Sequence, residues 1–163
     1  MTGSSPADGD RDARAAAEHA RALVASARAG ALATLGADGD PWASLVAYAP
    51  LDDGRPVLLL SRLAEHGRNL ERDPRASLLV TAAPGGADVL AAGRVTLAGV
   101  AERPAGDAAQ TALARYAAAV PGARAYADFG DFTPWVLRVD RVRWVGGYGE
   151  MASATGAAYA AAS

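Results

Sequence analysis

The residues best suited to bind a ligand form one short polar turn between two apolar segments. Residues 57–60 and 77–80 are apolar runs of strand length, which is typical of buried strands. The polar side chains between them are Ser61, Arg62, Glu65, His66, Arg68 and Asn69. A strand that ends in a hydroxyl and runs into a helix start presents free backbone N–H groups, which favour an anion. The turn is therefore predicted to form a phosphate pocket.

The same residues also fit a purely structural role, and the sequence leaves both interpretations open. Arg62, Glu65 and Arg68 have the spacing of exposed helical ion pairs, each worth about 0.3 kcal/mol. The Ser61 hydroxyl suits the N-cap of the following helix. His66 suits either donation to a phosphate or a hydrogen bond to a surface carbonyl, because imidazole changes role easily.

Composition excludes several kinds of chemistry. All 16 basic residues of the 163-residue chain are arginines, so Schiff-base catalysis and a P-loop lysine are excluded. The chain has no cysteine and two histidines, which excludes thiol catalysis and disfavours a zinc site, so no metal site is expected. A net charge of −2 gives no electrostatic case for nucleic acid. No residue is nominated as a catalytic acid or base.

The hydrophobic pattern predicts a mostly β protein with flanking helices. A helix is expected over residues 13–29, ended by Gly30 as a C-terminal cap, and a second over 107–119. Six strands are expected over residues 31–35, 42–49, 57–60, 77–80, 91–102 and 136–145. Alternation in the last strand slips by one residue near Asp140 and Arg141, which indicates a bulge. Hairpin-like connections favour an antiparallel barrel rather than a doubly wound fold.

The expected domain organisation is simple. Residues 1–10 are small, polar and acidic, as in a disordered tail. Residues 11–149 form one domain, and the alanine-rich residues 150–163 are expected to be a flexible C-terminal tail. The sequence starts without a signal-peptide pattern and has no apolar run near the ~20 residues that cross a bilayer, so we expect a cytoplasmic protein without a membrane partner.

Three blocks of sequence, in this order and spacing, resemble the FMN-binding split-barrel superfamily of pyridoxamine 5′-phosphate oxidase-like proteins. They are the hairpin over residues 30–46, the turn and return strand over 60–80, and the strand over 94–103, which ends G-x-A-E-R. The blocks S-R-L-A-E-H, from residue 61, and W-V-G-G-Y-G, from residue 144, are most similar to the HugZ-type branch, which includes haem-utilisation proteins. The resemblance implies a six-stranded antiparallel split β-barrel.

The resemblance also implies positions for a flavin phosphate. In flavin-binding relatives the phosphate is held by the second strand, the end of the third strand and basic residues in the turn. These positions fall here near Ser44, at Ser61, and at Glu65 and His66. Glu65 replaces the first basic residue, and a carboxylate repels a phosphate dianion.

Two arginines and two further positions complete the expected site. Arg62 or Arg68 is expected to supply the charge that Glu65 lacks, because the arginine fork suits phosphate. Arg94 stands where the oxidases place a polar residue near the isoalloxazine from the partner subunit, and a strand-edge arginine in solvent is the structural alternative. Trp144 is expected either to wall a planar ligand or to pack in the core.

The sequence leaves the cofactor open. The first hypothesis is an FMN-dependent oxidoreductase that works as a homodimer, in which the flavin carries the redox step. The second is a haem-binding protein of the HugZ type, although no histidine follows His66 to match the C-terminal iron ligand of those relatives. F420 in place of FMN, or a dimer without any cofactor, are the remaining alternatives.

Overall fold

The computed structural model describes residues 6–83, 88–126 and 129–163, and its secondary structure is mostly β with four α-helices. The strands are β1 (Ala29–Leu35), β2 (Pro41–Ala47), β3 (Ala49–Pro50), β4 (Pro56–Ser61), β5 (Arg75–Thr81), β6 (Arg94–Glu102), β7 (Phe132–Gly147) and β8 (Glu150–Thr155). The helices are α1 (Pro6–Ser26), α2 (Glu65–Arg72), α3 (Gly106–Ala119) and α4 (Gly156–Ala161), with a 3-10 turn, η1, over Pro121–Ala125.

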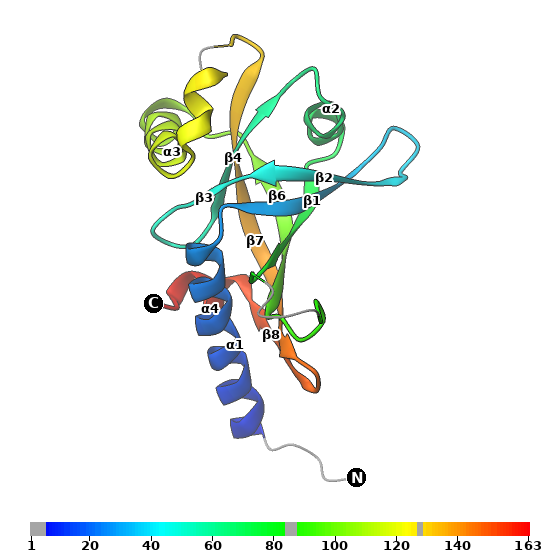
Figure 1. Ribbon diagram of the computed structural model, residues 1–163, viewed down its shortest axis with the longest axis vertical. Helices are drawn as coiled ribbons and strands as arrows, with labels where there is room; N and C mark the ends of the chain where they lie inside the picture. Colours follow the sequence, from blue (N-terminus) through cyan, green and yellow to red (C-terminus); the bar gives the residue numbers. More distant parts are fainter. Residues whose placement is uncertain (1–5, 84–87, 127–128) are drawn as a thin grey trace.

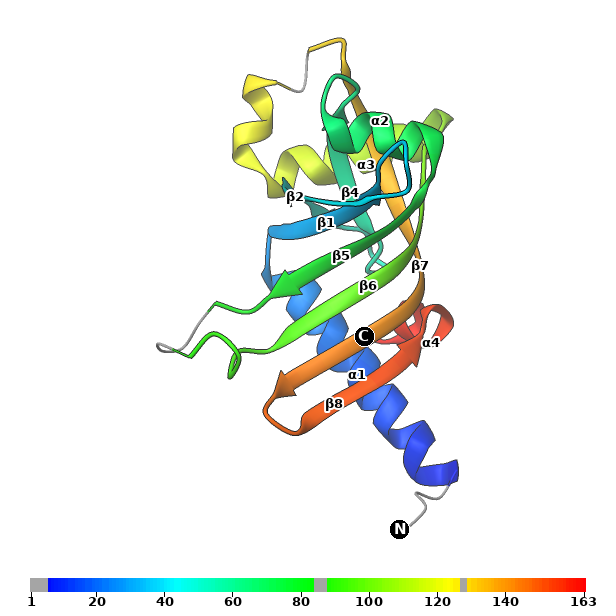
Figure 2. The ribbon, with the colours of Figure 1, turned by 90° about the vertical axis from the view of Figure 1, so that its right-hand side faces the viewer.

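The strands form one curved antiparallel sheet in the order β2-β1-β5-β6-β7-β4-β3, with β8 added to β7 (Figure 1). The 16-residue strand β7 joins the two halves, because it pairs β4 through its first part and β6 and β8 through its second. Figure 2 shows α1 crossing the lower half of the sheet while α2 lies at the upper end. The fold is thus a half-barrel, with two more strands than the six predicted.

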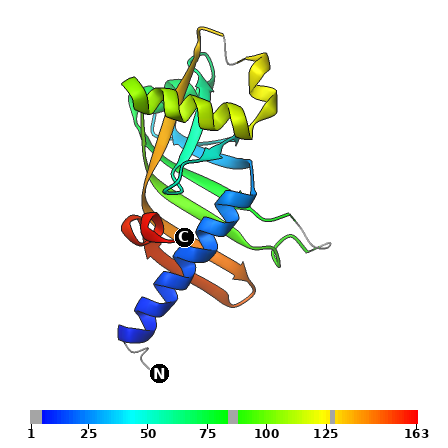
Figure 3. The same cartoon turned by 90° about the vertical axis from the view of Figure 1, so that its left-hand side faces the viewer.

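Two apolar clusters hold these layers together. The larger lies between α1 and the inner face of the sheet and includes Val24, Leu32, Leu78, Leu97 and Val142. The smaller packs α3 on β4 through Ala112, Tyr116, Val57 and Leu59. Figure 3 shows α3 and α1 on the same side of the sheet, at opposite ends. Within the described residues, the outer face of β1, β5, β6 and β7 has no helix over it.

The predicted bulge in the last strand is confirmed. Ala98 of β6 pairs Arg141, but Gly99 pairs Val139, so Asp140 is the extra residue on β7. A Cβ on Gly99 would lie 1.8 Å from the Arg138 carbonyl oxygen, so only glycine permits this close approach.

The expectation of a flexible tail over residues 150–163 is corrected by the structure. Residues 150–155 form β8 on β7, and α4 follows, with the Thr155 hydroxyl accepting from the Ala158 N–H at 3.2 Å. The Tyr159 ring is fully buried, and its hydroxyl donates to the Gly54 carbonyl at 2.8 Å. The buried side chains of Ala154 and Tyr159, together with backbone pairing, thus order a segment that offers few large apolar side chains.

The N-terminal prediction is corrected in part. Residues 6–10 are helical, so α1 starts earlier than residue 13, and it ends at Ser26 rather than residue 29. The rest of the tail predicted over residues 1–10 lies outside the described residues.

Candidate functional site

The predicted phosphate turn does bring Ser61 and His66 together. Both line a pocket of about 220 Å³ between β2, β4, α2 and α3. Ser61 is the last residue of β4, where its backbone pairs Phe132 of β7. Helix α2 starts four residues later with Glu65. The chain returns closely on itself here, since a Cβ on Gly67 would lie 2.1 Å from the Ser61 carbonyl oxygen.

Ser61 is not the N-cap of α2, because Ala64 holds that position and makes no side-chain cap. The Ser61 hydroxyl instead accepts from the Leu63 N–H at 3.1 Å and donates to the Asp131 carboxylate, which lies just before β7. A carboxylate therefore occupies the hydrogen-bonding position that a phosphate oxygen needs at this hydroxyl. The sequence analysis did not foresee Asp131, which lies 70 residues away.

The two arginines expected to supply positive charge are engaged elsewhere. Arg62 donates to the Gly130 carbonyl at 3.1 Å. Arg68 donates to the Glu65 carboxylate and to the Leu63 carbonyl, both at 2.5 Å. Both side chains are exposed, so these are surface contacts rather than groups aimed into the pocket. The alternative interpretation of the turn, in which its charges pair with one another, describes Arg68 and Glu65 well.

His66 is the free polar group of the pocket. Its imidazole makes no hydrogen bond or ion pair with any residue that the structure describes, and it is half-buried. Burial lowers the pKa of His66 below its ordinary value of 6.5, so the ring is neutral at pH 7. A neutral imidazole with free nitrogens is able to ligate a metal or act as a hydrogen-bond partner.

Most of the pocket wall is apolar and aromatic, and sequence reasoning missed it. Leu45, Leu59 and Phe132 line it together with a tyrosine pair, Tyr116 and Tyr126, whose hydroxyl oxygens are 3.1 Å apart. Burial raises the pKa of Tyr116 well above its ordinary range, so the Tyr116 hydroxyl stays protonated. Tyr116 of α3, Tyr126 just after η1 and Phe132 of β7 lie far along the chain from the turn, and only the aromatic content of residues 126–135 hinted at them.

A buried polar link fixes α2 on β1. The Asn69 side chain is fully buried; its amide donates to the Thr34 hydroxyl at 3.0 Å, and its oxygen accepts from Arg72 at 2.6 Å. Because a buried amide without partners is costly, this link holds the helix that carries His66 in one position.

The structure does not bring the remaining predicted residues to this pocket. Ser44 lies half-buried on β2 beside Leu45 but does not line the pocket. Arg94 starts β6, at the end of the sheet opposite α2 (Figure 2), and donates to the Leu90 and Ala92 carbonyls at 3.0 and 3.4 Å. Trp144 stacks on His19 of α1 with ring centroids 4.5 Å apart, and so packs the helix against β7.

No group of three or more histidine, aspartate or glutamate side chains gathers as a metal site within the described ranges. Among the same residues, no helix has the length and apolar character needed to cross a membrane.

The antiparallel half-barrel, with the turn from β4 into α2 at one end, is the fold of a split-barrel protein. The family model of pyridoxamine 5′-phosphate oxidase matches residues 16–146. This chain belongs to that family. Its similarity to haem-binding members, given below, agrees with the HugZ-type branch predicted from sequence.

Three relatives frame the comparison. The structure of a heme binding protein from Mycobacterium smegmatis is 59% identical, with a TM-score of 0.88 over 90% of this chain and 60% of that one. The chloroplastic heme oxygenase HOZ of Arabidopsis thaliana is 33% identical over 114 residues, which are 68% of this chain and 33% of that protein. Atu2129 of Agrobacterium tumefaciens, of unknown function, is 32% identical with a TM-score of 0.77, over 89% of this chain and 60% of that one. The chain thus spans less than two thirds of the length of each of these relatives.

Proposed function

We propose that this protein binds haem, as a member of the HugZ-type branch. The observation that carries the proposal is the 59% identity, over 90% of the chain, to a heme binding protein. Identity at this level includes most side chains of the fold, and the 33% identical relative from Arabidopsis is described as a heme oxygenase. Two relatives of different size thus point to the same prosthetic group.

The residues of the pocket fit this group. His66 offers a neutral imidazole without a partner among the described residues, and histidine is a common axial ligand of haem iron. Leu45, Leu59 and Phe132 offer the apolar surface that a porphyrin edge requires. When bound, the iron supplies the redox chemistry, while this chain positions the group and excludes water from one side of it.

FMN, the first cofactor hypothesis, fits the turn less well. Its phosphate dianion needs donors at Ser61, where the Asp131 carboxylate accepts, and the Glu65 carboxylate of the turn takes up the positive charge of Arg68. The Asp131 carboxylate repels a phosphate at this hydroxyl, and no arginine of the turn lines the pocket to compensate. F420 also carries phosphate, so the same objection applies. A dimer without cofactor stays as the alternative that the experiment must exclude.

Homodimerisation is part of the proposal. The pocket of about 220 Å³ is below the ~300–1,000 Å³ typical of small-molecule sites, so it holds only one edge of a porphyrin. The rest of the ring therefore needs a second surface. Leu45, which lines the pocket, is 83% exposed, and Trp42 on the same edge strand is 52% exposed, which supports a second copy at this edge.

Titration with hemin tests the proposal. We expect a Soret band that saturates at one hemin per chain, and His66→Ala to weaken binding at least tenfold and shift the band. His19→Ala is the matched control, because it removes the only other histidine, at the stack with Trp144. A parallel FMN titration and native mass spectrometry report the flavin alternative and the dimer. An unchanged hemin spectrum, or equal binding by His66→Ala, overturns haem binding through this pocket.

A further inference from the structure

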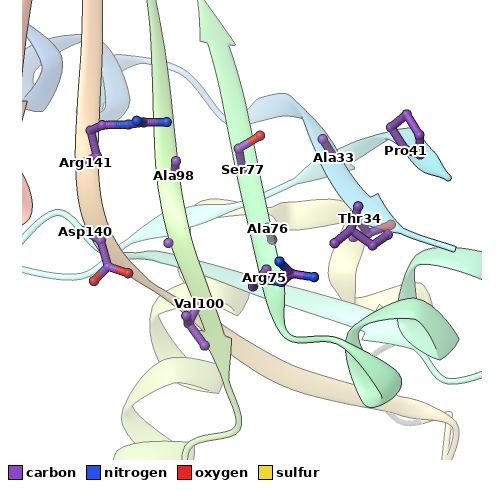
Figure 4. Close-up of a pocket in the computed structure, with 12 residues that line it drawn as sticks. Ala33, Thr34, Pro41, Arg75, Ala76, Ser77, Ala98, Val100, Asp140 and Arg141 are labelled. Carbon is purple, nitrogen blue, oxygen red and sulfur yellow. The ribbon is translucent and has the colours of Figure 1, made fainter. Parts of the chain in front are cut away.

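The lining of the His66 pocket contains no charged side chain among the residues that the structure describes. Most of the lining is aliphatic or aromatic, and its members with a side-chain oxygen or nitrogen are Ser61, His66, Tyr116 and Tyr126. The hollow on the outer face of the sheet differs, because two arginines and an aspartate stand there among small side chains (Figure 4). The charge of a ligand group therefore decides whether the His66 pocket accepts it.

Most of the polar groups in this pocket are already hydrogen-bonded. The Ser61 hydroxyl donates to the Asp131 carboxylate. The hydroxyl oxygens of Tyr116 and Tyr126 are 3.1 Å apart, so one donates to the other, which leaves one phenol proton for a further acceptor. A carboxylate in the pocket would find that phenol and the neutral imidazole of His66 as donors, with no cation to balance its charge. Burial of a carboxylate under these conditions is costly.

An aromatic row extends the apolar wall of the pocket outward. The centroid of the Phe132 ring lies 4.9 Å from that of Tyr126 and 6.3 Å from that of Phe129. Tyr126 and Phe132 line the pocket, whereas Phe129 is 58% exposed. Apolar surface thus continues from the pocket into solvent, and a flat ligand that emerges along it keeps aromatic contact.

We propose that the pocket selects the apolar edge of a tetrapyrrole, so that vinyl and methyl substituents enter it and the carboxylates stay outside. This inference rests on the proposed function, because it takes haem as the ligand of the pocket. The two propionates of haem lie at one edge of the ring, and the opposite edge carries only methyl and vinyl groups. That edge matches Leu59 and Phe132, whereas the propionate edge would bring two anions toward the Asp131 carboxylate.

Porphyrins altered at one edge test the proposal. Iron deuteroporphyrin 2,4-disulfonate carries a sulfonate in place of each vinyl group and keeps the iron and both propionates. We expect it to form the Soret band that depends on His66 at least tenfold more weakly than hemin. Iron deuteroporphyrin, which has hydrogen in place of each vinyl group, separates lost apolar contact from added charge and should bind with intermediate affinity. Hemin dimethyl ester, altered only at the propionate edge, should keep the band that depends on His66.

A new cation in the lining should change this preference. Ala64 lines the pocket at the N-cap of α2, where it has an extended backbone and makes no side-chain cap. We expect Ala64→Arg to raise the affinity for the disulfonate, relative to that for hemin, at least tenfold. Leu63→Arg is the matched control, because it adds the same charge one residue away, at a side chain that is 73% exposed and outside the lining. It should change this ratio less than twofold, with melting temperatures showing that both variants fold.

The outcomes separate this inference from the proposed function. Equal affinity of wild type for hemin and the disulfonate, with the band still dependent on His66, overturns the edge preference and leaves haem binding in place. A gain in hemin affinity in Ala64→Arg that the methyl esters abolish also overturns it, because the carboxylates are then the groups inside the pocket. The absence of any hemin band removes the proposed function and this inference with it.

Discussion

The turn after β4 and the bulge in β7 are both rich in charge, but they use it in opposite ways. In the turn, Ser61 bonds Asp131 and Arg68 bonds Glu65, so its polar groups are largely satisfied within the chain. At the bulge, the Asp140 carboxylate forms an ion pair with Arg138. Arg141 has no partner among the described residues. A motif thus indicates where a ligand group would lie. Whether the polar side chains there are still free to bond a ligand depends on residues from other parts of the chain.

The contrast also explains why the flavin hypothesis is weaker than the motif suggests. The resemblance places a phosphate at Ser61 on the strength of local sequence, but the competing acceptor comes from the segment before β7. His66 is the exception within the turn, because no described residue bonds its imidazole. The three predictions below test whether the turn is rigid, whether its carboxylates exclude phosphate, and whether His66 is neutral.

The largest expected effect is on the rigidity of the turn. In Gly67→Ala the new Cβ meets the Ser61 carbonyl oxygen, so α2 must move away from β4. We expect a loss of about 3 kcal/mol in unfolding free energy, or roughly 9 °C in melting temperature. Gly122→Ala is the control, because a Cβ there meets nothing within 4 Å, and it should change stability by less than about 0.5 kcal/mol. Equal stability of both variants would contradict the close packing of α2 on Ser61.

The second prediction neutralises two carboxylates, Glu65 in the turn and Asp131, which bonds the turn from the segment before β7. In the double variant Asp131→Asn, Glu65→Gln the acceptor of the Ser61 hydroxyl becomes neutral, and Arg68 loses its ion pair with Glu65. We expect FMN affinity to rise at least tenfold, about 1.4 kcal/mol, because repulsion of the phosphate is lost. Calorimetric titration with FMN measures it, and the double variant Asp38→Asn, Asp107→Asn, at two exposed positions, is the charge-matched control. If the double variant gains no affinity, the carboxylates do not decide between the cofactors.

Much of the fold was predictable because its signals are local. Strand alternation and hairpin turns located six of the eight strands, and one slip in alternation located the bulge at Asp140 and Arg141. The two missed strands have little signal of their own: β3 has two residues, and β8 is ordered by pairing with β7. Tyr159 lies in the segment that was expected to be flexible, and its burial is likewise an effect of tertiary packing.

Only the part of the pocket that the turn forms was predictable from the sequence. The strand-to-helix turn gave Ser61 and His66, which share a pocket as expected. Tyr116, Tyr126 and Phe132 come from elements 50 or more residues later, and no local pattern connects them with the turn. Sequence also cannot show that a charge is already paired, which is why Arg62 and Arg68 looked available.

The smallest expected effect is a pH dependence that isolates His66. Its pKa is lowered by burial in the folded protein and is about 6.5 in the unfolded chain, so the unfolded state takes up a proton first as the pH falls. This contribution to stability is therefore complete above pH 6.5 and is lost as the pH falls below it, until the folded ring is protonated too. Unfolding free energies of wild type and His66→Gln, measured by denaturant titration from pH 7.5 to 5, should converge or cross toward the acid side. A constant difference across this range would mean that His66 is not held neutral by the pocket, and the main reason to choose it as the iron ligand over the satisfied groups around it would be gone.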